Sequence, residues 1–239
     1  MEPTIYKPGA YKTPGIYNGA GGIYKGRGVY NEGEGGEDFV EIGGRRYPVV
    51  KIGNQLWIAK NLDYKFDYNG STLPIGDSGV PSTPAAWYYN NDENLYGIDG
   101  TYKCGLLYNW YAANYLDNNK NTLLPNGWRV PSQNDFDDLS NAVGGASIAG
   151  TKLKALDNSV TISFPSGFNG TNDYGFNALP AGDRLNTSFD DFGTYCNFWS
   201  GYDYSETRGY NYYITSAPNL QEGYAIKEYA ISIRLVKDA

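Results

Sequence analysis

The most constraining feature of this chain is its last segment, residues 199–239. The first half of the segment places tyrosine at alternate positions, at Tyr202, Tyr204, Tyr210 and Tyr212. The second half contains a continuous run of mostly apolar residues, 230–236, which predicts a buried closing strand. A strand that must pack in a core is thus joined to side chains that suit contact with another molecule. This combination predicts a binding surface carried on a rigid scaffold.

The alternation of residues 202–212 allows two local structures. The even positions carry Tyr, Tyr, Glu, Arg, Tyr and Tyr. In one strand all six would point to the same side and form a mixed aromatic and charged face. The intervening Ser205, Thr207 and Gly209 are small and do not resemble a thick core face, so a loop is an equal alternative. A further interpretation is that half of these tyrosines only cover the edge of the core.

The composition argues against several classes of function. The net charge of −7, without a basic cluster, argues against nucleic acid and anionic membranes as partners. Histidine is absent, which removes the commonest general acid–base and the commonest transition-metal ligand. Cys104 and Cys196 are too few for a zinc cage; they either pair or remain two buried thiols. We therefore expect a protein that is not an enzyme and that uses no cofactor or metal.

Residues 1–36 differ from the rest because they are rich in glycine and tyrosine. Triplets of an apolar residue, tyrosine and a polar residue recur, as in Ile5-Tyr6-Lys7 and Ile23-Tyr24-Lys25. Such a segment is either a flexible leader or an extended arm that orders when its aromatic side chains dock on another subunit. The regular placement of tyrosine favours docking. We expect an attachment or oligomerisation segment at 1–36 and a ligand-binding domain at 37–239.

The chain gives no sign of a membrane-directed segment. No apolar run approaches the ~18 residues of a membrane-spanning helix, so no membrane insertion is expected. The first residues lack both the basic and the apolar region of a classical signal peptide. A surface-binding protein without such a signal fits a component of a particle that is released by lysis.

Turn and cap signals predict an α+β fold. Residues 40–44 indicate a strand and turn, and Gly53-Asn54 between two alternating runs indicates a hairpin. Apolar spacing predicts one helix over 105–116. A second helix is predicted after Ser132, with Asp135 completing a capping box and Gly144-Gly145 ending the helix. The sequence also allows a further short helical turn over 147–156.

Core and surface roles follow from residue type. The tryptophans at 57, 110, 128 and 199 are expected to pack in the core. The acidic pairs at 137–138 and 190–191 are interpreted as solvated charges or loop ligands, because no spacing marks the two carboxylates of a glycosidase.

Several motifs in order carry a family resemblance. They are Gly-Trp-Arg-Val-Pro-Ser at 127–132, Leu-Pro-Ala-Gly-Asp-Arg at 179–184, Phe-Trp-Ser at 198–200 and Ser-Ile-Arg-Leu-Val at 232–236, together with residues 50–62 and 108–112. Over roughly residues 39–239 the chain resembles the Fibrobacter succinogenes major paralogous domain family. This resemblance implies an α+β, C-type lectin-like fold of the formylglycine-generating-enzyme branch. Such a fold has two helices, small antiparallel sheets and long loops, here preceded by an extended Gly/Tyr-rich segment.

The activities known for that fold are not implied here. Formylglycine-generating enzymes use a reactive cysteine pair near the C-terminus, whereas only Cys196 lies in that half of this chain. Calcium-dependent lectins use a motif such as Glu-Pro-Asn, whereas this chain has Ala217-Pro218-Asn219, which lacks the carboxylate.

The C-terminal segment resembles the variable proteins of diversity-generating retroelements. Those proteins display mutated residues on a ligand-facing surface, as phage tropism determinants do. The matching positions are Tyr202, Tyr204, Glu206, Arg208, Tyr210, Tyr212, Tyr213, Tyr224, Glu228 and Tyr229. This chain departs from the pattern at 199–203, where Trp-Ser-Gly-Tyr-Asp replaces Trp-Ser-Ser-Thr-Glu, and at Ala230, where glycine is usual.

The resemblance implies a phage tail adhesin in the virion tail. Such a protein would recognise a host cell-surface protein or glycan, attach to other tail proteins through residues 1–36, and form a homotrimer. The alternative is a static bacterial surface adhesin or envelope-binding module of the same fold, located at the bacterial cell surface.

Overall fold

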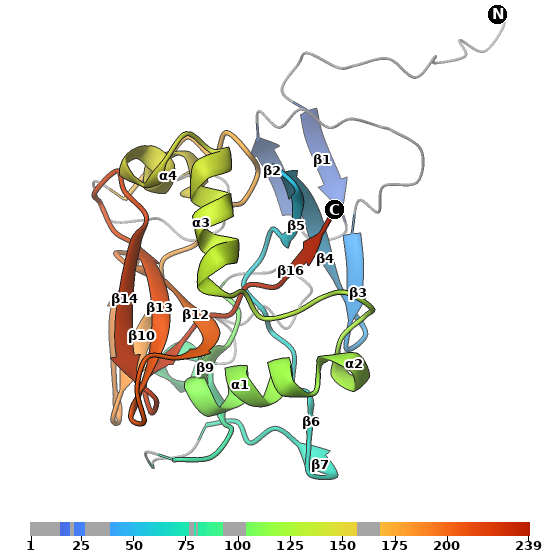
Figure 1. Ribbon diagram of the computed structural model, residues 1–239, viewed down its shortest axis with the longest axis vertical. Helices are drawn as coiled ribbons and strands as arrows, with labels where there is room; N and C mark the ends of the chain where they lie inside the picture. Colours follow the sequence, from blue (N-terminus) through green and yellow to red (C-terminus); the bar gives the residue numbers. More distant parts are fainter. Residues whose placement is uncertain are drawn as a thin grey trace, which may run out of the picture.

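The computed structural model describes residues 39–76, 79, 81–92, 104–156 and 168–239, together with the backbone of 15–19 and 22–26. Within this part, small antiparallel sheets are combined with four α-helices (Figure 1). The predicted α+β class is confirmed, with more helices than the two that were expected. The helices are α1 (Trp110–Asn118), α2 (Lys120–Leu123), α3 (Gln133–Ala142) and α4 (Ala146–Leu153), with a 3₁₀ turn η1 at Tyr89–Asn91.

Three sheets make up most of the described fold. The four-stranded sheet has the order β16-β5-β4-β3, formed by Val236–Asp238, Gln55–Ile58, Arg45–Ile52 and Phe39–Ile42. The five-stranded sheet has the order β11-β10-β15-β9-β8, formed by Ser188–Phe192, Ala181–Leu185, Ala230–Ile231, Leu107–Asn109 and Ala86–Trp87. The three-stranded sheet has the order β12-β13-β14, formed by Cys196–Asp203, Arg208–Ile214 and Gln221–Ile226. In Figure 1 this sheet stands at the left with α3 in front of it.

Two short hairpins complete the strands. One pairs β6 (Asp67–Tyr68) with β7 (Ser71–Thr72). The other pairs β1 (Gly15–Gly19) with β2 (Gly22–Gly26) and lies in the Gly/Tyr-rich segment, of which only this backbone is described. The rest of residues 1–36 lies outside the described residues, so the division between 36 and 37 stays a prediction.

The predicted hairpin at Gly53-Asn54 is confirmed. Strands β4 and β5 pair antiparallel on either side of it, with Ile52 opposite Gln55. Gly53 has a positive φ of 61°, a conformation in which glycine carries no steric penalty. The strand and turn predicted at 40–44 are also present, as β3 followed by a turn into β4.

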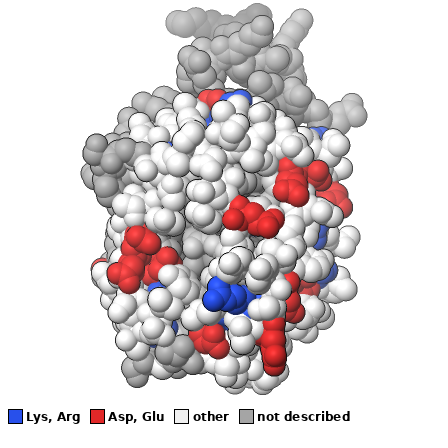
Figure 2. All heavy atoms as spheres, turned by 60° about the vertical axis from the view of Figure 1, so that its left-hand side comes forward, with Lys and Arg blue, Asp and Glu red and all other residues white. Residues whose placement is uncertain are grey.

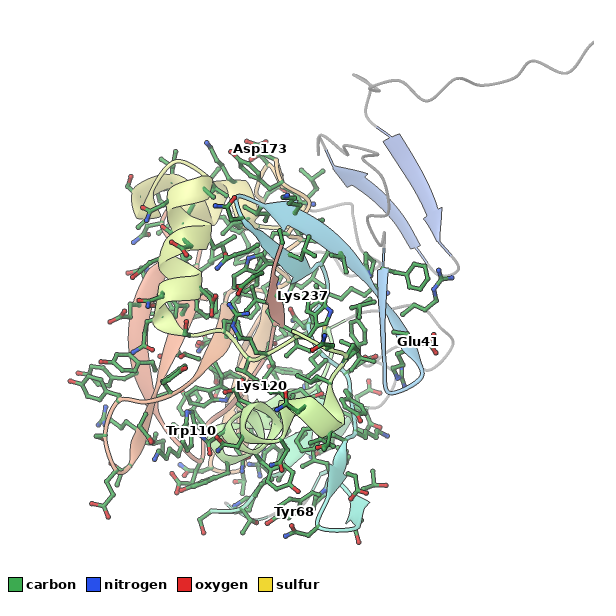
Figure 3. All side chains as sticks on the ribbon, turned by 45° about the vertical axis from the view of Figure 1, so that its right-hand side comes forward. Glu41, Tyr68, Trp110, Lys120, Asp173 and Lys237 are labelled. Carbon is green, nitrogen blue, oxygen red and sulfur yellow. The ribbon has the colours of Figure 1, made fainter. Side chains whose placement is uncertain are left out.

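The helix predicted over 105–116 begins later than expected. Residues Leu107–Asn109 form β9 instead, because they pair with β8 and β15 on either side. The side chain of Asn109 then accepts a hydrogen bond from the backbone N–H of Ala112, which starts α1 at Trp110. Sheet pairing and an N-cap thus override the helical spacing of the first residues. Figure 3 looks nearly along α1 and labels Trp110 and Lys120 beside it.

The predicted capping box at the start of α3 is confirmed. The Ser132 hydroxyl accepts from the backbone N–H of Asp135, and the Asp135 carboxylate accepts from the backbone N–H of Ser132. Phe136, Leu139 and Val143 lie on one side of this helix and are buried in the core. The helix ends where expected, before Gly144-Gly145, and α4 then occupies most of the stretch at 147–156 where a short turn was expected.

The core role of the four tryptophans is confirmed. Trp57, Trp110, Trp128 and Trp199 are all 5% exposed or less. Trp57 packs on Phe136 and Phe176, and the Trp199 indole N–H donates to the backbone carbonyl of Tyr108 at 2.7 Å. The tryptophans divide between two core clusters, with Trp57 in the cluster under α3 and the other three in the cluster around α1.

The single closing strand predicted at 230–236 is wrong, although the whole run is buried. Residues Ala230–Ile231 form β15 in the five-stranded sheet, and Val236 begins β16 in the four-stranded sheet. The run between them crosses from one sheet to the other. Buried Arg234 lies in this crossing, and its guanidinium donates to Asn61 and to the backbone carbonyl of Ile58.

Among the described helices, none has both the length and the apolar character to span a membrane.

Candidate ligand-binding surface

The tyrosine-rich stretch forms a hairpin, so neither of the two alternatives for 202–212, one strand or a loop, describes it alone: the ends of two strands are joined by a turn. Strand β12 ends at Asp203 and β13 begins at Arg208, with Asp203 paired opposite Gly209. In the turn between them, the backbone N–H groups of Tyr204 and Ser205 both donate to the carbonyl of Arg208. The pairing of β12 with β13 is irregular between Trp199 and Asp203, which is typical of a β-bulge. Strand β14 then pairs with β13, so that Tyr224 lies opposite Tyr210.

The end of this hairpin carries a cluster of exposed aromatic side chains. The rings of Tyr204 and Tyr224 stack with centroids 4.2 Å apart, and Tyr210 meets Tyr204 edge-on at 5.2 Å. The Arg208 guanidinium lies 5.0 Å from the centre of the Tyr224 ring. We use the term hairpin surface for the exposed or half-buried residues Tyr202, Tyr204, Glu206, Arg208, Tyr210 and Tyr224.

The hairpin surface is anchored to the scaffold through its reverse side. Gly209 lies directly against the indole of Trp110, and a β-carbon at this position would overlap the ring. Lys227 lies 4.1 Å from the centre of the same ring and forms an ion pair with Asp203. The backbone of Lys227 also donates to the carbonyl of Thr207. These contacts hold the turn in place beneath the exposed tyrosines.

The other predicted site residues lie elsewhere. Tyr212 is only 3% exposed, stacks on Phe136 at 4.2 Å and donates its hydroxyl to Glu222. Burial, followed by this hydrogen bond to Glu222, raises the pKa of Tyr212. It lies on the same side of β13 as Tyr210, but α3 covers it. Tyr212 is therefore a core residue, and we leave it out of the hairpin surface.

Tyr213, Glu228 and Tyr229 lie apart from the hairpin surface. Tyr213 lies in β13 on the side opposite to Tyr210 and stacks on Tyr195 with centroids 6.0 Å apart. Glu228 accepts a hydrogen bond from the hydroxyl of Tyr111. Tyr229 is half-buried against the core, and burial raises its pKa to about 12, with a smaller contribution from Asp183 and its acidic neighbours. The ten predicted residues thus do not form one surface.

A polar cleft adjoins the hairpin surface at Tyr202. Its volume is about 480 Å³, within the range of roughly 300–1,000 Å³ that small-molecule sites occupy. The cleft is lined by Asn54, Gln55, Asp117, Lys120, Arg129, Val130, Ser132, Asn134, Asp135, Asp138, Tyr202, Asp238 and Ala239. Except for Tyr202, sequence reasoning did not place these residues in a site, because five separate segments contribute them. The capping box and the motif at 127–132 signalled only local structure.

The floor of the cleft is a network of ion pairs and hydrogen bonds. The Arg129 guanidinium lies 2.6 Å from the Asp135 carboxylate and 2.7 Å from that of Asp238. Gln55 donates to Asp135, and the Trp57 indole N–H donates to Gln55. Burial alone would lower the pKa of Arg129, but its hydrogen bonds to Asp238 and Asp135 outweigh that effect and raise it. The floor is therefore charged but internally paired.

The third polar feature is a group of carboxylates around Asp183 in β10. Asp183 is 3% exposed, its Oδ1 has no hydrogen-bond partner, and it pairs in register with Asp190 of β11. Burial, reinforced by the charges of Asp191 and Asp190, raises the pKa of Asp183 to about 7. Within the described ranges, no cluster of three or more acidic or cysteine side chains is arranged to hold a metal ion.

Both cysteines are buried. Cys104 and Cys196 do not form a disulfide in the structure. Burial raises the pKa of Cys196 well above its ordinary value, which keeps the thiol protonated and unreactive at neutral pH. Of the two alternatives, the buried thiols are therefore correct.

The structure thus defines an α+β domain with an aromatic hairpin surface and an adjoining polar cleft. Residues 50–237 match the family model described as the Fibrobacter succinogenes major domain, and the chain belongs to this family. Neither the curated proteins nor the solved structures contain a match to the chain.

Proposed function

We propose that this chain is a non-enzymatic binding protein that contacts a host cell-surface molecule through the hairpin surface. The observation that carries the proposal is the grouping of exposed aromatic side chains. Among the described residues, the large hydrophobic side chains that remain exposed are Phe39, Ile148, Tyr202, Tyr204 and Tyr224. Three of these five belong to the hairpin surface. Contiguous exposed apolar area on a folded domain marks an interaction site.

The chemistry of the hairpin surface supports contact with a macromolecule. Tyrosine offers a large, stiff ring with a hydroxyl at its tip and loses little conformational entropy on binding. The stacking of Tyr204 on Tyr224 fixes both rings before a ligand arrives. Arg208 beside them adds a cationic anchor of the type enriched at the centres of interfaces. Figure 2, turned toward this side of the molecule, shows several separate acidic groups with few basic ones between them.

The proposal extends to the biological setting of the protein. It includes a C-type lectin-like fold with a diversified C-terminal segment. It also places the protein in a phage tail, as a trimer that attaches to the particle through residues 1–36. These parts of the proposal are supported by the motif resemblance, by the Gly/Tyr-rich segment and by the exposed hairpin. The absence of histidine and the burial of both thiols support a binding role over a catalytic one.

The hairpin surface can be tested by binding of the purified protein to intact candidate host cells. We expect Tyr204→Ala with Tyr224→Ala to weaken binding at least about thirtyfold, because one truncated hot-spot side chain costs about 2 kcal/mol or more. Flow cytometry with labelled protein measures the change. Phe39→Ala is the matched control, since it removes an exposed aromatic ring from β3. Equal binding by the double variant and the Phe39 variant would contradict the proposal.

Diversification of the C-terminal segment has a separate, genomic test. We expect a near-copy of the coding sequence for residues 199–239 beside a reverse-transcriptase gene, with the differences concentrated at adenines. Sequencing of the source genome decides this. If both the near-copy and the gene are absent, the hairpin surface is static, and only the diversification part of the proposal is lost.

A further inference from the structure

The cleft beside Tyr202 has the features of a second ligand subsite. It lies where the start of α3, the end of β16, the turn after β4 and the α1–α2 junction meet the end of β12. Lys120, which Figure 3 labels beside α1, lines it from the α1–α2 side. Tyr202 belongs both to the lining of the cleft and to the hairpin surface, so the two adjoin at this residue.

The groups available to a ligand are those at the rim. Floor residues Arg129, Asp135 and Gln55 already hydrogen-bond to one another, which fixes their positions. At the rim, and within the part of the chain that the structure describes, the exposed side chains of Asn54, Asn134 and Asp138 have no hydrogen-bond partner. The rim therefore offers two amides, each a donor and an acceptor, and one carboxylate acceptor.

The charge of the cleft selects a neutral ligand. Four carboxylates line it, from Asp117, Asp135, Asp138 and Asp238, and they repel an anion. The two cations, Lys120 and Arg129, already pair with three of these carboxylates. Two of the four negative charges therefore remain uncompensated, but Asp138 and Asp238 are exposed, so water screens this excess and it does not select a strongly cationic ligand. A neutral ligand with many hydrogen-bonding groups remains.

Hydroxyl groups match this rim better than other neutral groups do. A hydroxyl both donates and accepts, so neighbouring hydroxyls can satisfy an amide and a carboxylate together. The Tyr202 ring, which is 52% exposed, offers a flat apolar face at the edge of the cleft. We propose that the cleft binds a neutral sugar ring of a host-surface glycan, independently of calcium. This inference rests on the proposed function, because the glycan is taken to belong to the molecule that the hairpin surface contacts.

The test uses the full chain on an array of neutral oligosaccharides and their sialylated counterparts, in the presence of EDTA. We expect binding to a subset of neutral glycans and at least tenfold weaker binding to the sialylated forms. Asn134→Ala and Asp138→Ala should each weaken binding at least about tenfold. Asp137→Ala is the matched control, because Asp137 is an exposed carboxylate next in sequence that does not line the cleft.

The outcomes separate this inference from the proposed function. Absence of binding to every neutral glycan, or equal binding by the Asp137 and Asp138 variants, overturns the cleft inference. In that case cell binding that depends on Tyr204 and Tyr224 still upholds the proposed function. Neutral-glycan binding that is lost in the Asn134 and Asp138 variants supports the inference, even where the hairpin variants leave cell binding unchanged and the proposed contact surface fails. Thermal unfolding of each variant confirms that these exposed substitutions leave the fold intact.

Discussion

Replacing Arg234 by methionine is expected to destabilise the domain by about 3–5 kcal/mol. The Arg234 side chain is 0% exposed and donates to the Asn61 side chain and to the backbone carbonyls of Ile58, Phe176 and Asn177 at 2.7–2.9 Å. Methionine fills a similar volume but donates nothing, so four buried acceptors would lose a partner. Since a domain is stable by only about 5–15 kcal/mol, this loss is a large part of the total.

Chemical denaturation of the purified protein measures this change. Arg46→Met is the matched control, because Arg46 is exposed on β4 and its loss should cost less than about 1 kcal/mol. If the Arg234 variant does not accumulate as folded protein, Arg234→Lys gives a second measurement. Lysine keeps a positive charge but has fewer donors, so an intermediate loss is expected. A loss below about 1 kcal/mol for Arg234→Met would show that the guanidinium network does not hold these segments together.

Local signals predicted the elements that depend on neighbouring residues. The capping box of Ser132 and Asp135 and the turn at Gly53-Asn54 act within four residues, and both occur in the structure as expected. Arg234 shows the opposite case. Its partners lie in segments far away in the sequence, and an arginine in an apolar run gives no sign of them. The motifs around Asn61 and Arg234 carried the family resemblance, but only the fold shows that the two side chains meet.

The hairpin surface was predicted in part, for a reason that Tyr210 and Tyr212 illustrate. Alternation correctly places both on one side of β13, but the sequence does not say that α3 covers only Tyr212. Tyr224 stacks on Tyr204 because β14 folds back on β13, a pairing that alternation within one strand does not contain. The cleft was not predicted, because its rim combines Asn54, Asn134 and Tyr202 from separate segments. Alternation within one strand can be predicted from the sequence. Which residues another helix or strand covers depends on tertiary packing and cannot.

Replacing Asp183 by asparagine is expected to stabilise the domain above neutral pH and to flatten its pH dependence. The folded-state pKa of about 7 lies above the ordinary value of 3.8, so the folded chain keeps a proton that the unfolded chain has already lost. As pH rises between these two values, the unfolded state is increasingly favoured, and the stability that the protonated group contributes is lost. The rise of about three pH units in pKa corresponds to at most about 4 kcal/mol.

The measurement is the free energy of unfolding of both proteins at several pH values from about 4 to about 8. Near the lower limit, Asp183 is protonated in the folded state and still partly protonated in the unfolded state, so asparagine should give little gain. Near the upper limit the variant should be more stable by about 1–3 kcal/mol, because it no longer buries a charge. The gain is smaller than the upper bound of about 4 kcal/mol because the asparagine amide leaves some buried polar atoms unpaired. Asp190→Asn is the matched control, since Asp190 is the exposed register partner of Asp183 and should shift the profile only slightly. Parallel profiles for the wild-type and Asp183→Asn proteins would show that Asp183 ionises normally in the folded state.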